Sequence, residues 1–341
     1  MLAFIAKRIV NYIVLTIVAT TLGYILASTT LNPAARFLGR NPAVPQGTID
    51  ASLRKLGADP NTPILVRTWD WWVGLVTHGS LGMSSRGTEV TADIIARSGT
   101  SLRLLVIGTL LGALFGVLLG VWNAVRQYKV SDQVSTYASF TVLMTPPFVI
   151  AVVLMILATS LNQGVGAQVI SFTGEYTPGV SGFFPVLGDR LVHLLLPTIS
   201  LTVGAVASYS RYQRSAMLDV LSNDFIRTAR SKGRTRGSAI MRHGVRVALI
   251  PMSTFFAYSF GLILTGASIT ELVFSWHGMG EYFIQSITNN DINAAAGTIL
   301  FTAILVLIAG TLADLLYAAL GPASEGVTRV CSRPHDHDHR R

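Results

Sequence analysis

Long apolar stretches alternate with short charged segments along this chain. Six stretches are almost free of charged residues, and they span residues 9–31, 104–122, 137–161, 191–210, 247–268 and 294–320. Uninterrupted apolar runs of about 18 residues or more are typical of helices that cross a bilayer, because the hydrocarbon core is about 30 Å thick. The pattern therefore predicts an all-α membrane protein with six transmembrane helices.

The second apolar stretch has glycines at a fixed interval. They recur at every fourth position, at residues 108, 112, 116 and 120. Residues four apart lie on one face of an α-helix, and glycines on that face allow another backbone to approach closely. We therefore expect this helix to pack tightly against a second helix through its glycine face.

The third apolar stretch contains the sequence Thr145-Pro146-Pro147. Proline has no backbone N–H, so it leaves carbonyl groups that must face protein or water inside a membrane. The sequence therefore predicts a kink in this helix. A kink that lines a translocation path through these three residues and a kink that serves only packing are equally compatible with the pattern.

The charged residues indicate how the chain is oriented. Only 13% of its 341 residues are charged, and the formal net charge is +9. Lys and Arg gather in the cytoplasmic loops of membrane proteins, so this basic balance does not require a nucleic-acid partner. The same rule predicts that both termini and the loops 123–136 and 211–246 are cytoplasmic, and that segments 32–103, 162–190 and 269–293 are external.

Segment 32–103 is too long to be a simple connection. It contains three of the five Trp residues, at positions 69, 71 and 72. A Trp cluster is typical of a helix at the bilayer interface, and we expect a packed external helical subdomain rather than a carbohydrate-stacking platform. The chain then divides into the first helix plus this subdomain (1–103), a transmembrane domain (104–320) and a cytoplasmic tail expected to be disordered (321–341).

The loop 211–246 contains nine Arg or Lys and two Asp. Asn223 or Ser222 can cap a helix of about nine residues that begins at Asp224, and Gly233 can end it. Such a helix is too short to be stable alone in water. Its apolar side chains share one face, so it could dock into a groove of another protein. Composition alone favours a simpler interpretation, a cytoplasmic loop that contacts lipid headgroups.

The stretch DFIRTARSKGRTRGSAIMRHGVRVALIP, residues 224–251, closely resembles the cytoplasmic EAA loop of the B-type permease subunits of bacterial dipeptide and oligopeptide ABC importers. Of that loop's general Glu-Ala-Ala pattern only Ala229 and Gly233 are present, a variation that is similar to the peptide-importer branch. Further stretches resemble landmarks of the family in the same order: GSLGMS (79–84), TPPF (145–148), HLLLPTISL (193–201), VFSWHGMG (273–280) and DLLYAAL (314–320).

The resemblance covers about residues 3–321 and implies the type I ABC importer permease fold in a bacterial inner membrane. It implies that the short basic helix is a coupling helix seated in a cleft of an ATPase subunit. The residues expected to couple are Asp224, Phe225, Ile226, Arg227, Thr228, Ala229, Arg230, Lys232 and Gly233. It also implies a second homologous permease subunit, two ATP-binding subunits and an extracytoplasmic peptide-binding protein.

ATP hydrolysis is expected on those partners. A phosphate-binding loop of the form G-x-x-x-x-G-K-[ST] needs a lysine after a glycine. The four lysines, at positions 7, 55, 129 and 232, follow other residues. The sequence therefore predicts a chain that is not an enzyme and has no cofactor or metal of its own, with ATP and Mg bound by the partner subunits.

The external loop 269–293 has no Lys or Arg, and it contains the aromatic and glycine-rich stretch VFSWHGMGEYF. The resemblance places this loop opposite the peptide-binding protein. The predicted contact residues are Phe274, Trp276, Met279, Glu281 and Tyr282; packing among helices is an equally simple role for the aromatic ones.

Asp314 is the one clear acid within a predicted span. A carboxylate inside a membrane is a functional hypothesis by default, and a stand-alone proton-coupled carrier or channel is the alternative function. Packing at the helix end or pairing with a basic loop residue is the favoured role of Asp314. His193 is expected to be structural, and the three histidines of the tail, at 335, 337 and 339, are not expected to form a functional metal site.

Overall fold

The elements of secondary structure in the described residues are helices, apart from one isolated β-bridge between Met83 and Glu89. The computed structural model describes residues 2–39 and 42–320, with the side chains of 7–39, 42–256 and 267–316. The elements are α1 (Leu2–Thr30), the 3-10 turn η1 (Pro33–Phe37), α2 (Gln46–Lys55), α3 (Ile64–His78), α4 (Val90–Val125), α5 (Val130–Met144), α6 (Pro147–Val165), α7 (Phe183–Leu221), α8 (Asp224–Ser231), α9 (Arg236–Ala239), the π turn η2 (Ile240–Gly244), α10 (Val245–Val273), α11 (Met279–Thr288) and α12 (Ile292–Leu320). The predicted all-α class is confirmed.

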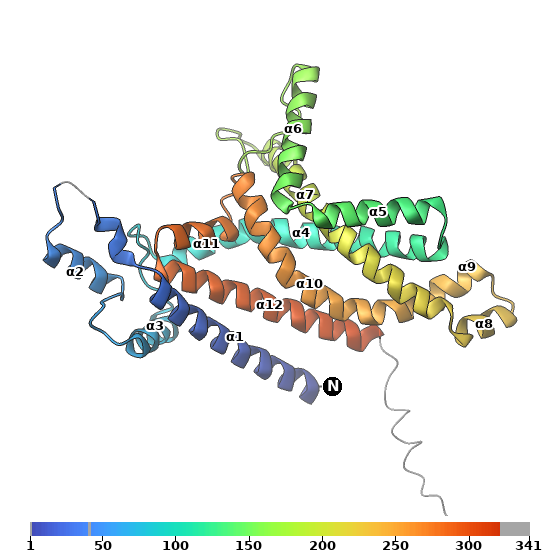
Figure 1. Ribbon diagram of the computed structural model, residues 1–341, viewed down its shortest axis with the longest axis horizontal. Helices are drawn as coiled ribbons and strands as arrows, with labels where there is room; N and C mark the ends of the chain where they lie inside the picture. The colour runs from blue at the N-terminus through green and yellow to red at the C-terminus, as the bar shows by residue number, and fades with distance from the viewer. Residues whose placement is uncertain (1, 40–41, 321–341) are drawn as a thin grey trace, which may run out of the picture.

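Most of the long helices lie roughly along one axis and give the molecule an elongated shape (Figure 1). Helices α2, α3 and α11 lie towards one end, and α8 and α9 lie at the other. Among the described residues, five helices are long and apolar enough to cross a membrane: Lys7–Thr30, Val90–Val125, Pro147–Val165, Phe183–Leu221 and Ile292–Leu316. The fifth predicted span, 247–268, lies within α10, several of whose side chains are outside the described set.

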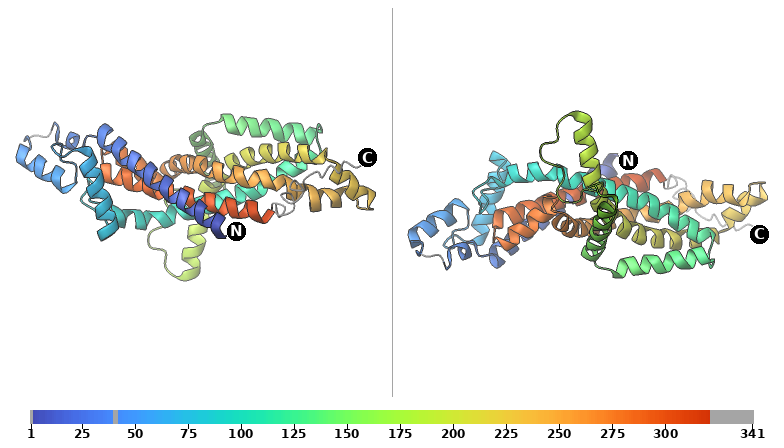
Figure 2. Two further views of the ribbon diagram at one scale, coloured as in Figure 1. Left: turned by 90° about the horizontal axis from the view of Figure 1, so that it is seen from below. Right: turned by 90° about the horizontal axis from the view of Figure 1, so that it is seen from above.

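The third predicted span, 137–161, is not one helix. Helix α5 ends at Met144, and α6 begins at Pro147. Thr145 (φ −83°, ψ 124°) and Pro146 (φ −57°, ψ 140°) are both extended. Proline disfavours the α conformation in the residue before it, and it is well suited to the first position of a helix. The two prolines therefore separate two helices instead of kinking one, and α6 turns sideways from the long helices (Figures 1 and 2).

The predicted glycine face of α4 packs against α7. A Cβ atom built on Gly116 would lie 2.5 Å from the Cβ of Tyr209, and one built on Gly120 would lie 2.7 Å from the Cβ of Gln213. Any side chain at these positions would collide with α7, so only glycine permits the observed approach of the two helices. The facing residues of α7 also recur every fourth position: Leu201, Ala205, Tyr209 and Gln213.

The described residues of segment 32–103 include α2, α3 and the start of α4, and α3 packs against α1. Trp71 is buried, and its Nε1 donates to the carbonyl oxygen of Leu81 (3.0 Å). Trp72 Nε1 donates to Thr21 Oγ1 of α1 (3.0 Å), while 69% of Trp69 is exposed. The three Trp side chains therefore divide between the core of this segment and its surface.

Candidate functional site

The short basic helix is α8, and its end has a specific geometry. Gly233 follows the helix with a φ of +85°, a region that favours glycine. Its N–H donates to the carbonyl oxygen of Arg230 (3.0 Å), and the N–H of Arg234 donates to that of Ala229 (3.3 Å). This pair of bonds is the Schellman motif, so the predicted stop at Gly233 is confirmed. Asn223 occupies the predicted N-cap position, although its side chain makes no capping hydrogen bond.

The apolar side chains of α8 point in two directions. Ile226 is 5% exposed, and its Cδ1 would lie 3.5 Å from a Cβ built on Gly244 in η2. Phe225 is 39% exposed. Ile226 thus attaches α8 to its own chain, whereas Phe225 is partly exposed to solvent. Asp224 and Arg227, paired at 3.7 Å, have 92% and 82% of their side chains exposed.

A nearly continuous helical segment links this region to the membrane domain. Thr235 caps α9, accepting a hydrogen bond at Oγ1 from the N–H of Ser238 (3.3 Å). Helix α9, the π turn η2 and α10 then follow one another without a break from Arg236 to Val273. The second half of the basic loop is thus helical and continues into the fifth predicted span. The π turn was not foreseen; such turns are frequent at functional sites.

An ion pair near α8 was also missed by the sequence analysis. Arg214 of α7 binds both carboxylate oxygens of Asp132 in α5, at 2.7 and 2.8 Å. Only 3% of the Asp132 side chain is exposed. The hydrogen bond from Arg214 holds the pKa of Asp132 below its usual value. The residues are far apart in sequence, so no local pattern indicates their pairing.

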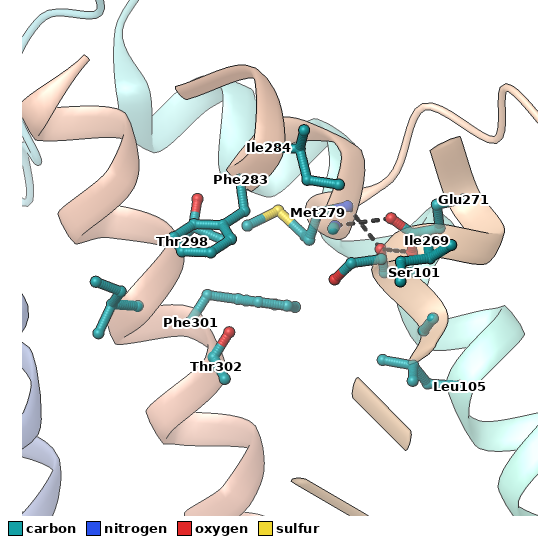
Figure 3. A pocket seen from close by; sticks show the side chains of 14 residues that line it. Ser101, Leu105, Ile269, Glu271, Met279, Phe283, Ile284, Thr298, Phe301 and Thr302 are labelled. Carbon is teal, nitrogen blue, oxygen red and sulfur yellow. Dashed lines mark hydrogen bonds between the residues drawn. The ribbon is translucent and has the colours of Figure 1, made fainter. Parts of the chain in front are cut away.

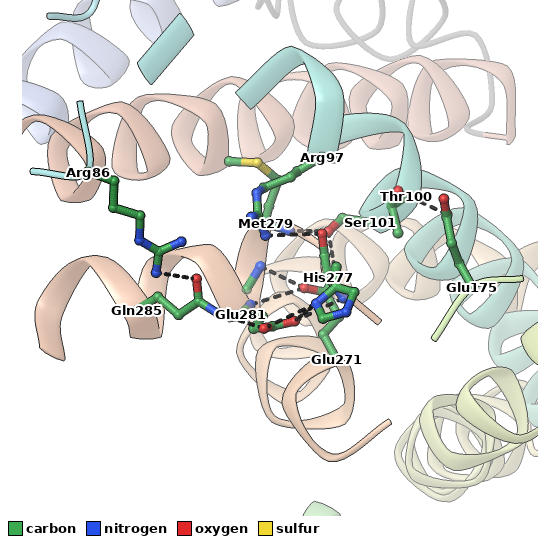
Figure 4. Close-up of polar contacts among 11 residues, drawn as sticks. Arg86, Arg97, Thr100, Ser101, Glu175, Glu271, His277, Met279, Glu281 and Gln285 are labelled. Carbon is green, nitrogen blue, oxygen red and sulfur yellow. Dashed lines mark hydrogen bonds and ion pairs between the residues drawn. The ribbon is translucent and has the colours of Figure 1, made fainter. Parts of the chain in front are cut away.

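Glu271 holds the loop 269–293 in place, as Figure 4 shows. One of its carboxylate oxygens accepts from Ser101 Oγ of α4, and the other accepts from the N–H groups of Gly280 (2.7 Å) and Glu281 (3.2 Å) at the start of α11. An acidic group at a helix N-terminus satisfies free N–H donors and complements the helix dipole. Glu271 therefore fastens α10, α4 and α11 to one another.

Gly278 and Gly280 permit this arrangement by their small size. A Cβ built on Gly278 would lie 2.5 Å from the Glu271 carboxylate carbon, and one built on Gly280 would meet Ser268. The two glycines therefore allow the backbone to approach α10 closely.

The loop residues predicted to contact a binding protein are buried in this chain. Phe274, Trp276, Met279 and Tyr282 are each at most 3% exposed, and Glu281 is 6% exposed. Trp276 Nε1 donates to the carbonyl oxygen of Thr100 (3.2 Å). These side chains hold the loop in shape. The exposed neighbour is His277, with 67% of its side chain accessible and its Nδ1 3.1 Å from Glu281.

An apolar cavity of about 390 Å³ lies behind this loop, between α4, α10, α11 and α12. Figure 3 shows the side chains of Met279, Phe283 and Phe301 around it, with Glu271 and Ser101 at one side. Both carboxylate oxygens of Glu271 are already hydrogen bonded, so the cavity presents an apolar surface.

A second cavity lies at the break between α5 and α6. It has a volume of about 240 Å³, and Thr145 and Pro147 are among its lining residues, whereas Pro146 is not. Ser200 of α7 also lines it, and the Ser200 Oγ has no hydrogen-bond partner among the described residues. The break therefore borders a space with an unpaired hydroxyl.

Asp314 is paired within the chain. Its Oδ1 lies 3.4 Å from Arg8 of α1, and its Oδ2 accepts from the Tyr12 hydroxyl (3.2 Å). The partner is a residue of the first helix, so the acid helps to join α1 and α12. His193 is buried with its Nδ1 2.9 Å from the carbonyl oxygen of Asp189, as a structural histidine would be. The described residues contain no cluster of potential metal ligands, and the tail histidines lie outside them.

Known proteins resemble this chain over most of its length. The Oligopeptide transport system permease protein OppB of Mycobacterium tuberculosis (strain ATCC 25618 / H37Rv) is 46% identical over 323 residues, which cover 94% of this chain and 98% of that protein. The Oligopeptide transport system permease protein AppB of Bacillus subtilis (strain 168) is 30% identical over 328 residues, covering 95% of this chain and 100% of that one.

The fold has a counterpart among solved structures. A chain of the MetNI methionine ABC transporter, in inward facing conformations, matches with a TM-score of 0.51 and 15% sequence identity, covering 67% of this chain and 96% of that one. At 15% sequence identity, this match indicates a similar fold and nothing further. The family model for the binding-protein-dependent transport system inner membrane component matches residues 112–325, more than half of the chain. With helices long enough to cross a bilayer several times and a near relative at 46% identity, the chain belongs to the family of binding-protein-dependent transport system inner membrane components, as one of its multi-pass permeases.

Proposed function

We propose that this chain is the transmembrane permease subunit of an ATP-driven oligopeptide importer. Two relatives whose names specify oligopeptide transport, at 46% and 30% identity over nearly the whole chain, support the substrate class. In this proposal the chain forms half of the translocation path, and a second homologous permease subunit forms the other half. An extracytoplasmic peptide-binding protein delivers the substrate.

The geometry of α8 is the observation that carries the proposal. The helix is stopped by the left-handed Gly233, attached to η2 by Ile226, and left with Phe225 exposed among cationic side chains. A short helix that presents one apolar anchor ringed by charge is suited to a groove on another protein. Two ATP-binding subunits, which hold the ATP and Mg, would each receive one such helix from the two permeases.

The orientation follows from the same proposal. Docking of α8 to ATPase subunits places the basic loops 123–136 and 211–246 in the cytoplasm together with both termini. The end that contains α2, α3 and α11 then faces the binding protein. Because Trp276 and its neighbours are buried, the surface offered there is formed by exposed residues of the same loop, including Leu272, His277 and Ile287.

The translocation path is proposed to pass the break between α5 and α6. Thr145 and Pro147 line the 240 Å³ cavity there, and the unpaired Ser200 Oγ provides a polar group facing it. A membrane-embedded break in a helix is tolerated where it borders protein or water, which suits a position on the path.

The test is reconstitution of the chain with a second permease subunit, ATPase subunits and a peptide-binding protein. Tripeptide uptake into proteoliposomes should require ATP and the binding protein. Phe225→Ala should weaken retention of the ATPase subunits about 5- to 30-fold, since loss of one buried interface anchor typically costs about 1–2 kcal/mol.

The control for Phe225→Ala is Val130→Ala, which shortens an exposed apolar side chain in a different helix, α5. ATPase retention should be normal in this control. Uptake that continues without ATP, or ATPase retention in Phe225→Ala equal to that in Val130→Ala, would refute the proposed function.

A further inference from the structure

A cleft with charged lining residues lies at the end of the molecule opposite α8, and the proposed import cycle assigns no role to its residues. Its volume is about 610 Å³, and it is bounded by α2, α3 and residues of α1 and α12. Figure 1 shows these elements together at the end where α1 finishes and α12 begins. Tyr24, Trp71 and Asn293 are among its lining residues.

Cationic side chains outnumber acidic ones in this cleft. Arg54, Lys55 and Arg67 line it together with Asp59 and Asp70. Arg54 is paired with Asp59 at 3.3 Å, which leaves two cations against one acid. The Arg67 Nε is buried and has no hydrogen-bond partner among the described residues. A buried donor without a partner costs free energy, so the cleft favours an anionic ligand with acceptor oxygens.

Contacts with α1 place the cleft at the edge of the bilayer. Trp72 is bonded to Thr21, and the rings of Trp71 and Tyr24 are 5.3 Å apart. At about 1.5 Å per residue, these α1 residues lie roughly 9–14 Å before the helix end at Thr30. The apolar span of α1 is slightly longer than a hydrocarbon core of about 30 Å. With an excess of about 3 Å at each end, these residues lie roughly 6–11 Å inside the hydrocarbon boundary, about the depth to which interfacial helices bury their apolar face.

The outer face of α3 has the character of an interfacial helix. It exposes 74% of Leu65, 69% of Trp69 and 79% of Val76. Apolar side chains with an exposed Trp on one face are typical of helices that lie in the membrane interface. The opposite face of α3 provides Arg67 and Asp70 to the cleft. One helix thus contacts acyl chains on one side and borders a cationic cleft on the other.

We propose that this cleft binds the headgroup of an anionic phospholipid, with the phosphate held by Lys55 and Arg67. The depth of α3 brings lipid phosphates to the level of the cleft. The volume of 610 Å³ accommodates a headgroup, whereas a free phosphate would leave most of the space to water. The bound lipid ties α2 and α3 to the end of the transmembrane bundle. The proposal does not depend on the transported substrate.

The experiment is native mass spectrometry of the full chain in its permease complex, titrated with dioleoyl phosphatidylglycerol or dioleoyl phosphatidylcholine. The wild type should bind one phosphatidylglycerol at least about tenfold more tightly than phosphatidylcholine. Lys55→Gln and Arg67→Gln should each weaken phosphatidylglycerol binding about fivefold, the effect of one cation beside an anionic lipid surface, and leave phosphatidylcholine binding unchanged.

Arg86→Gln is the matched control, because Arg86 is exposed in the same segment, outside the cleft, and bonded to Gln285. It should retain wild-type binding. Lys55 is exposed at the end of α2, so its substitution tests the proposal even if Arg67→Gln does not fold.

Competition distinguishes the other sources of an anionic group. Millimolar inorganic phosphate or a tripeptide should not displace the lipid. Displacement by either would assign the cleft to free phosphate or to a peptide carboxylate and overturn the proposal. Equal binding of the two lipids, or unchanged phosphatidylglycerol binding in both cleft variants, would overturn it as well.

Discussion

Gly116→Ala tests whether close approach of α4 and α7 stabilises the permease. The added Cβ would lie 2.5 Å from the Cβ of Tyr209, whereas carbon atoms in contact are about 3.5–4.0 Å apart. Tyr209 Cβ is fixed to its backbone and cannot rotate away. The two helices must therefore separate locally by about 1.0–1.5 Å.

That separation has a calculable cost. A gap of about 0.5–1 Å already removes a quarter to a half of the dispersion energy of the neighbouring contacts. Overpacking of this kind typically costs about 1–3 kcal/mol. Alanine is a better helix former than glycine by up to about 1 kcal/mol, which offsets part of the loss. A control must remove this propensity term.

Gly99→Ala is that control. Gly99 lies in the same helix, and a Cβ built on it meets nothing within 4 Å. Gly99→Ala therefore gains the same helix propensity as Gly116→Ala without a collision with α7. We expect the midpoint of thermal denaturation in detergent to be lower for Gly116→Ala than for Gly99→Ala. The difference should reflect about 1–3 kcal/mol, or roughly 2–4 °C per kcal/mol. Equal midpoints for the two variants would refute the packing argument.

Three further predictions concern polar and turn residues. Gly233→Val forces a β-branched residue to a φ of +85° and should reduce substrate-stimulated ATP turnover of the assembled complex. The control Gly237→Val, at an open position in α9, should leave this ATP turnover unchanged. Equal stimulation in both variants would show that the turn is irrelevant. Asp132→Asn leaves Arg214 without its partner and should lower stability at pH 7 by about 3 kcal/mol. Because the folded pKa of Asp132 is depressed, this stabilisation is present above the unfolded pKa and is lost as pH falls through the folded pKa. The denaturation midpoints of wild type and Asp132→Asn should therefore converge only below about pH 4. Convergence already at pH 6, or an equal loss of stability in the exposed control Asp219→Asn, would contradict the ion-pair argument. Asp314→Asn breaks a half-exposed pair with Arg8 and should leave peptide uptake intact and independent of the proton gradient. Abolished uptake in this variant, together with dependence of wild-type uptake on the proton gradient, would instead support the alternative function of a proton-coupled carrier.

Local patterns predicted the features that depend on local chemistry. The glycine interval in α4 identified a close-packing face, because the spacing of residues on a helix is fixed. Gly233 identified the end of α8, because a left-handed residue is needed there. The two prolines identified an interruption in the third span. Its extent was underestimated, since the sequence does not show whether neighbouring helices hold the two halves in line.

Long-range pairs could not be predicted in the same way. Asp132 and Arg214 are joined by the packing of α5 on α7, and nothing near either residue in sequence indicates the other. The aromatic residues of loop 269–293 have the composition of a contact surface and the burial of a core. The local signal for that burial was the glycine pair at the start of α11, since glycines at the N-cap and in the first turn of a helix permit close approach of another backbone. Glu271, seven residues before Gly278, provides the cap that this approach requires.

The two candidate sites lie at opposite ends of one helix. At the start of α10, the π turn η2 contacts α8 through Gly244 and Ile226, and near its end Glu271 is bonded to α4 and α11. A packed helix transmits displacement as a rigid body, whereas a π turn has irregular hydrogen bonding and can absorb it. A movement imposed on α8 is therefore transmitted first to η2, the more deformable element, and only then to α10. The stiffness of five residues, 240–244, then sets how much of that movement arrives at the Glu271 junction and the external loop.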